Sequence, residues 1–196
     1  MNYLAHAYLS NNDEGLLLGN FIADHIRGNN FNHLSEEIKK GVYLHRKIDQ
    51  FTDEHPSFKQ SKRLFYDGFE KYSGVLVDIY FDHLLAKNFL SYSSKNLAEF
   101  TSHVYGIYEK NKQVLPENSE RFLSYVLSNN IYFAYSKIEG IEKVLFHLSH
   151  RINHGVMLNA SVPLFKRNEI AFQENFDVFI KDIIDEFMLK KITKPI

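Results

Sequence analysis

Residues 74–89, GVLVDIYFDHLLAKNF, most constrain what this chain can fold into. Wound as a helix, the segment is apolar around nearly its whole circumference, and such a helix is normally buried inside a protein. Two carboxylates interrupt it, because Asp78 and Asp82 lie four residues apart on one face. The rest of the chain must therefore enclose this helix and also supply something cationic beside the two acids.

The other segments repeat apolar residues at helical spacing, and none shows an alternating strand pattern with a hairpin turn. The 196 residues include only 9 glycines and 4 prolines, whereas 17 phenylalanines and 12 tyrosines supply large surfaces for helix packing. The sequence predicts an all-α fold, a single domain over 1–196 built as a bundle of about seven or eight helices. We expect helices over about 13–27, 35–51, a short stretch from 56, 74–89, 94–115, 119–136, 139–153 and a last segment through 176–187.

Ionisable residues recur at the edge of the apolar faces of these helices. Asp24 falls on the apolar side of the first, and His45, Asp49 and Thr52 form a stripe along the second. A buried carboxylate costs several kcal/mol unless it is paired or coordinated, so either a network with arginine or a metal ion is expected. Carboxylate and imidazole together suit Mn²⁺, Mg²⁺ or Fe²⁺ better than a structural zinc site.

The composition excludes several classes of function. With 23 basic and 24 acidic residues the net charge is −1, which gives no general reason to bind nucleic acid or a membrane surface. There is no cysteine, and we find no signal peptide and no run of about 20 apolar residues. These features predict a cytoplasmic protein. An acidic partner would have to meet a local basic patch, such as the lysines and arginines of residues 39–47 and 62–63.

Four stretches, taken in order, resemble the acyl carrier protein phosphodiesterase family, which is similar to the HD-type metal-dependent phosphohydrolases. They are MNYLAHAYLS at the start, LLLGNFIADHIRG, GVYLHRKIDQFTDEHP, and SGVLVDIYFDHLLAKNF. The resemblance implies an HD-domain-like helical fold. It also implies an enzyme that cleaves the phosphodiester between 4′-phosphopantetheine and a serine of its partner, the acyl carrier protein.

The resemblance further implies roles for individual residues. A divalent metal, with Mn²⁺ favoured, would be held by Asp24, His45, Asp78 and Asp82. Asp49 would orient His45 or accept the proton of the attacking water, and His6 or His83 would protonate the leaving alkoxide. Phosphate oxygens and the acidic carrier protein would be bound by Arg46, Arg27, Lys47 and Lys62.

Two other readings of the residues remain open. One is an HD-type phosphohydrolase acting on a nucleotide or another small phosphoester, which needs no glycine-rich phosphate loop. The other is a helical binding module without catalysis, in which the buried carboxylates pair with Arg27, Arg46 or Arg151. The sequence assigns no oligomeric state.

Overall fold

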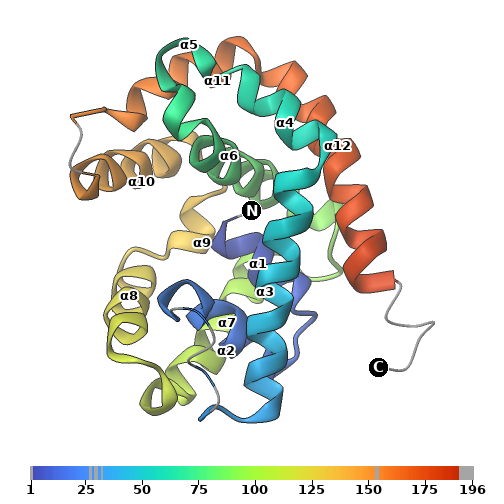
Figure 1. Cartoon of the computed structure of the whole chain (residues 1–196), viewed down its shortest axis with the longest axis vertical. Helices are drawn as coiled ribbons and strands as arrows, with labels where there is room; N and C mark the ends of the chain where they lie inside the picture. Colours follow the sequence, from blue (N-terminus) through green and yellow to red (C-terminus); the bar gives the residue numbers. More distant parts are fainter. Residues whose placement is uncertain (1, 27, 29–30, 32, 153–154, 190–196) are drawn as a thin grey trace.

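The computed structural model describes residues 2–26, 28, 31, 33–152 and 155–189, and these contain helices but no strand (Figure 1). The all-α prediction is therefore confirmed for this part of the chain. The α-helices are α1 (Tyr3–Leu9), α2 (Glu14–Ile22), α3 (Glu36–Glu54), α4 (Pro56–Arg63), α5 (Tyr66–Phe69), α6 (Ser73–Lys87), α7 (Leu97–Lys110), α8 (Glu117–Ser128), α9 (Ile131–Ala134), α10 (Ile138–Arg151), α11 (Val162–Arg167) and α12 (Glu169–Ile184). The shorter 3-10 helices are η1 (Ala23–His25), η2 (Glu70–Tyr72), η3 (Phe89–Ser91), η4 (Lys112–Val114) and η5 (Leu158–Ser161), and a π-helix, η6 (Asp185–Leu189), ends the described chain.

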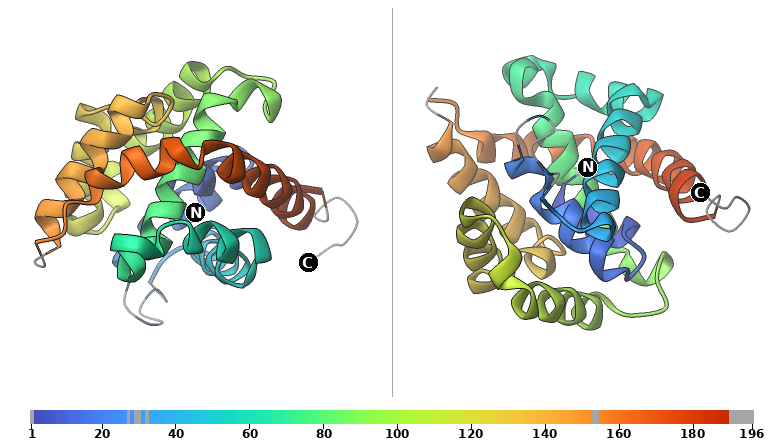
Figure 2. Two further views of the ribbon diagram at one scale, coloured as in Figure 1. Left: turned by 90° about the horizontal axis from the view of Figure 1, so that it is seen from above. Right: turned by 60° about the horizontal axis from the view of Figure 1, so that its bottom comes forward.

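The apolar segment 74–89 forms α6, and this helix is buried as predicted. It packs against α1, α4, α10 and α12, with α10 on one side and the long α12 on the other (Figures 1 and 2). Tyr80 and Phe81 are fully buried, and the Phe165 ring stacks on Tyr80 at 4.1 Å between centroids. None of the helices in the described part of the chain combines the length and hydropathy needed to span a bilayer.

Helices α2 and α3 lie in backbone contact, because a glycine on each leaves no side chain between them. A Cβ on Gly19 would lie 2.0 Å from the Ile38 carbonyl oxygen, and one on Gly41 would lie 2.7 Å from the Gly19 Cα. Only glycine fits at such a distance. The contact positions the polar residues that follow, since Asn20 comes directly after Gly19 and His45 lies one turn after Gly41.

The described chain contains more helices than the seven or eight predicted. The helix expected over 119–136 is wrong as a single element, because Asn130 has a left-handed backbone (φ 44°) that separates α8 from α9. The short helices α1, α5 and α11 were also not expected, since each holds too few residues for a helical repeat to be recognised. Asp13 and Ser35 are the N-caps of α2 and α3, each accepting a backbone N–H of the first turn.

Candidate functional site

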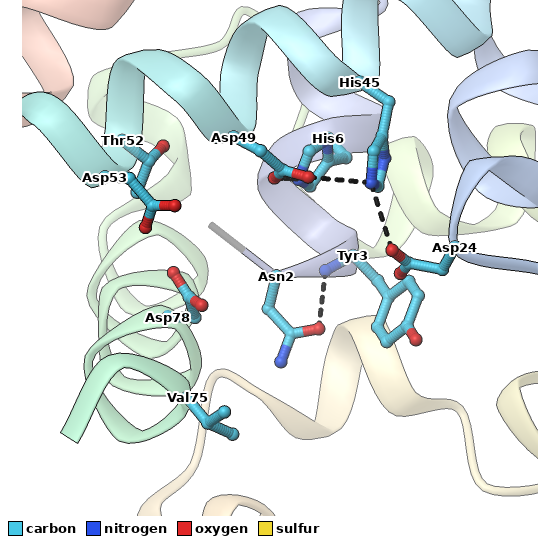
Figure 3. Close-up of a pocket in the computed structure, with 10 residues that line it drawn as sticks. All are labelled: Asn2, Tyr3, His6, Asp24, His45, Asp49, Thr52, Asp53, Val75 and Asp78. Atoms are coloured by element: carbon cyan, nitrogen blue, oxygen red, sulfur yellow. Dashed lines mark hydrogen bonds and ion pairs between the residues drawn. The ribbon is translucent and has the colours of Figure 1, made fainter. Parts of the chain in front are cut away.

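A cavity of about 320 Å³ opens where α1, α3, α6 and η1 meet, and its walls are mostly polar (Figure 3). Its lining residues are Asn2, Tyr3, His6, Asp24, His45, Asp49, Thr52, Asp53, Val75 and Asp78. The stripe predicted on the second helix thus forms one wall, because His45, Asp49 and Thr52 all face the cavity.

Two buried imidazoles lie at the centre of this site. The rings of His6 on α1 and His45 on α3 stack with centroids 4.2 Å apart and an angle of 23°. Asp49 contacts both, with Oδ1 3.2 Å from His6 Nε2 and Oδ2 3.1 Å from His45 Nε2. One nitrogen or oxygen from each of the three residues lies within 4.8 Å of the others, a spacing that fits a single metal ion.

Asp24 lies beside this group of three and contacts one of its members. It lies on η1, directly after α2, and its Oδ1 is 3.1 Å from the same Nε2 of His45 (Figure 3). Two imidazole nitrogens and two carboxylates therefore converge from three different parts of the chain. Nitrogen and oxygen donors in this mixture suit Mn²⁺ or Fe²⁺ well and Mg²⁺ less well.

The electrostatics of the group follow from burial and from these contacts. Burial lowers the pKa of His6. Burial acts on His45 in the same direction, but its hydrogen bonds to Asp24 and Asp49 outweigh it and raise the His45 pKa to about 9. For Asp24 and Asp49, burial would raise each pKa, yet the bonded imidazoles hold both below the ordinary value. The imidazoles thus favour the charged form of the Asp24 and Asp49 carboxylates.

Asn20, buried on α2, connects the two imidazoles from behind. Its side-chain Oδ1 lies 2.8 Å from His6 Nδ1 and 2.9 Å from His45 Nδ1. Its Nδ2 donates to the His6 carbonyl oxygen at 3.0 Å and to Ser10 Oγ at 3.1 Å. Each ring is therefore held at Nδ1 by the same amide and presents Nε2 to the cavity.

The two carboxylates of α6 have different surroundings. Asp78 is half-buried on the cavity wall across from Asp49, and burial raises its pKa (Figure 3). Asp82 is fully buried one turn further along, outside the cavity lining, where it accepts backbone N–H groups from Asn2, Leu4 and Ala5 at 2.8–3.3 Å. Asp82 therefore contacts the backbone at the N-terminus of α1 and does not belong to the group of His6, His45 and Asp49.

We expect Asp82→Ala to lower the free energy of unfolding by at least about 2 kcal/mol, because the buried N–H groups of Leu4 and Ala5 and the partly buried N–H of Asn2 lose their acceptor. Asp53→Ala removes an exposed carboxylate from α3 without that loss and is the control. Urea denaturation of both variants measures the difference. Equal stability of the two variants would show that the carboxylate of Asp82 does not hold α1.

The other residues expected at the site lie elsewhere. His83 is buried away from the cavity, with Nδ1 donating to the Tyr135 carbonyl oxygen at 2.7 Å. Arg46 donates to the Gly28 carbonyl oxygen and lies over the Phe31 ring at 5.0 Å. Neither His83 nor Arg46 lines the cavity. Lys47 is exposed on α3, Lys62 on α4 extends over the Phe58 ring at 5.9 Å, and Arg27 lies outside the described residues.

Sequence reasoning missed several residues of the site. Asn20 was recognisable only as a polar residue on the apolar side that also carries Asp24. Tyr3 at the cavity wall has a raised pKa from burial and from nearby Asp24, so its hydroxyl keeps its proton. Thr52 was predicted as part of the stripe, but its burial was not: it is almost fully buried, and its Oγ1 has no hydrogen-bond partner among the described residues.

The chain is similar to known proteins over most of its length. A family model described as acyl carrier protein phosphodiesterase matches residues 1–183. A protein of that name from Pectobacterium atrosepticum is 33% identical over 152 residues, 77% of this chain and 79% of the relative. Relatives with the same name from Photorhabdus laumondii and Escherichia coli are 30% and 29% identical over 77% of the chain, covering 77% and 79% of their own lengths. No solved structure matches.

The chain belongs to the acyl carrier protein phosphodiesterase family, because the family model covers nearly its whole length. The group of His6, His45 and Asp49, and Asp24 beside it, fall within the matched residues.

Proposed function

We propose that this protein hydrolyses holo-acyl carrier protein, releasing 4′-phosphopantetheine and leaving a free serine on the carrier protein. The observation that carries the proposal is the family match over residues 1–183, and the polar cavity with its four donors supports it. In this reaction the oxygen of water bonds to phosphorus, the bond between phosphorus and the serine oxygen breaks, and that oxygen takes up a proton. We place the reaction in the cytoplasm.

We also propose that the cavity holds a divalent cation, with Mn²⁺ the first candidate and Mg²⁺ or Fe²⁺ as alternatives. The donors would be His6, His45, Asp49 and Asp24, which differs from the predicted set by including His6 and Asp49 in place of Asp78 and Asp82. The spacing of the His6, His45 and Asp49 atoms supports a shared ion, and Asp24 lies next to them, 3.1 Å from His45 Nε2. When bound, such an ion neutralises phosphodiester charge and lowers the pKa of water. We also propose that the protein is similar to the HD-type phosphohydrolases. That proposal depends on this donor set.

The remaining residues of the cavity would serve the phosphodiester. Tyr3 keeps its proton and is a hydrogen-bond donor to a phosphoryl oxygen, and the buried hydroxyl of Thr52 is a second one. Asp78 lies across the cavity from Asp49, and because burial raises its pKa it can carry the proton that the serine oxygen takes up. These roles replace those first expected for His83 and Arg46.

The test of the proposed function is incubation of the Mn²⁺-loaded protein with holo-acyl carrier protein in water enriched in ¹⁸O. We expect the carrier protein to lose the mass of phosphopantetheine and the released 4′-phosphopantetheine to contain one ¹⁸O atom. Label in the carrier protein would mean that the bond between carbon and oxygen breaks instead. No loss of mass, with a nucleotide or another small phosphoester hydrolysed in its place, would favour the alternative substrate class.

The binding-module alternative predicts pairing of the carboxylates with arginine. In the structure, Asp24 and Asp49 face imidazoles, and Arg46 contacts the backbone of Gly28. Metal analysis of the purified protein separates the two proposals, because a module held by ion pairs would contain no stoichiometric divalent ion.

Metal binding should be coupled to proton release. Without metal, His45 is protonated at pH 7 because its pKa is about 9, and a metal ligand must be neutral. We expect Mn²⁺ to release about one proton at pH 7 and its affinity to rise with pH up to about 9. Since the pKa is raised, the stability that His45 contributes without metal is present below about pH 6.5 and is lost as pH rises through about 9.

Calorimetric titration with Mn²⁺ in buffers of different ionisation enthalpy measures this proton release. His45→Gln should abolish it. His6→Gln is the matched control, because burial lowers the pKa of His6, so that variant should bind metal more weakly yet still release the proton. Proton release that persists in His45→Gln would contradict the assignment.

Docking of the acidic carrier protein is proposed for bases of α3 and α4, among them the exposed Lys47 and the half-buried Lys62. Charge reversal at Lys47 and Lys62 should slow association with holo-acyl carrier protein, and the defect should shrink as salt screens the wild-type attraction. Lys166→Glu, an equal charge change at an exposed position of α11, is the control. Stopped-flow association rates at low and high salt test whether these lysines dock the carrier protein. Equal slowing in the control would assign the effect to net charge alone.

A further inference from the structure

The side chain of Asn20 makes four hydrogen bonds, two through Oδ1 and two through Nδ2. It is almost fully buried, and it bonds through Oδ1 to both imidazoles and through Nδ2 to the His6 carbonyl and Ser10. A buried amide with all its groups paired is rigid, and any change of partner would leave a polar atom unsatisfied.

The orientation of this amide follows from its partners. The His6 carbonyl oxygen can only accept a hydrogen bond, so the atom of Asn20 facing it must be the donor nitrogen. Ser10 Oγ donates its own hydrogen to that same carbonyl at 2.9 Å and is therefore an acceptor toward Asn20. With Nδ2 fixed on that side, Oδ1 must face the two rings.

The orientation of the amide in turn determines where the imidazole protons lie. An amide oxygen only accepts, and its two lone pairs match two donors, so each ring must carry a proton on Nδ1. A neutral imidazole with Nδ1–H has its lone pair on Nε2. Both Nε2 atoms face Asp49, at 3.2 and 3.1 Å, on the cavity side of the rings.

We propose that Asn20 is a positioning residue that holds His6 and His45 as a pair, both with Nδ1–H and both with Nε2 directed into the cavity. This deepens the proposed function and depends on it only where the cation is concerned. One side chain thereby sets the proton position of two rings on different helices, and the contact of Gly19 with Gly41 brings it within reach of His45. Residues that orient metal-binding histidines in this way typically change metal affinity 10–100-fold when they are replaced.

The direct test is nuclear magnetic resonance of the imidazole nitrogens in the metal-free full chain. In the wild type we expect hydrogen-bonded Nδ1–H protons on His6 and His45 that exchange slowly with water. Asn20→Leu keeps the branched shape but removes the acceptor, so both protected signals should disappear, and Mn²⁺ affinity measured by calorimetry should fall about 10–100-fold. Persistence of both Nδ1–H signals together with unchanged affinity would overturn the proposal.

Two further variants separate positioning from folding. Ser10→Ala removes a hydrogen bond from the opposite end of the same amide, so it should lower the melting temperature while leaving both Nδ1–H signals in place. Asn20→Asp keeps an acceptor oxygen for the rings and should retain the signals even where Asn20→Leu fails to fold. Loss of the signals in Ser10→Ala to the same extent as in Asn20→Leu would overturn the proposal, because any disturbance of the core would then suffice. A wild type that shows the Nδ1–H pair but binds no Mn²⁺ would refute the cation and support the role of Asn20.

Discussion

Asp49→Asn is expected to abolish stoichiometric Mn²⁺ binding and to lower the rate of holo-acyl carrier protein hydrolysis on the order of a thousandfold. Asp49 contacts both imidazoles, so the amide removes the charge that joins the two halves of the donor group. The several kcal/mol that a metal ion contributes at a phosphoryl centre correspond to roughly three powers of ten in rate. Steady-state hydrolysis and metal content of the purified variant measure both effects.

The control for Asp49→Asn is Asp53→Asn, the same change one turn further along α3. Asp53 also lines the cavity but is exposed and lies outside the group of close donors. This variant should keep its Mn²⁺ and most of its activity. If the two variants lost metal equally, the negative field of the cavity would account for binding, and Asp49 would not be a specific ligand.

The largest effect on stability is expected for Gly41→Ala, which should cost about 3 kcal/mol or more. The added Cβ would lie 2.6 Å from the Leu16 carbonyl oxygen and 2.9 Å from the Gly15 carbonyl oxygen, so α2 and α3 must move apart. That movement separates His45 from Asn20, and Mn²⁺ affinity should fall with stability.

Gly106→Ala is the matched control for this glycine. It lies within α7, and a Cβ there would meet nothing within 4 Å, so alanine should stabilise the helix by about 0.5–1 kcal/mol. Guanidinium denaturation of the two variants gives the comparison. Gly41→Ala with wild-type stability would mean that α2 and α3 do not depend on backbone contact.

Local patterns were sufficient to predict several parts of this protein. The apolar circumference of residues 74–89 predicted the buried helix α6, and the four-residue spacing of His45 and Asp49 placed both on one cavity wall. Both predictions depend on helical geometry within a single segment, which the sequence contains in full. The same reasoning placed Asp78 and Asp82 together, because they share a helical face, and could not distinguish the environments on successive turns of that face.

The sequence by itself therefore determined the all-helical class, the buried helix and the stripe of His45, Asp49 and Thr52, since each follows from the spacing of nearby residues. Only the tertiary structure decided which distant groups meet. It brings His6 of α1 against His45 of α3, joins the two through Asn20, and assigns Asp82 to the backbone of α1. The physical reason is that these contacts depend on how closely helices approach, which Gly19 and Gly41 set for α2 and α3, and on where buried N–H groups need an acceptor. Neither quantity can be read from the periodicity of a single segment.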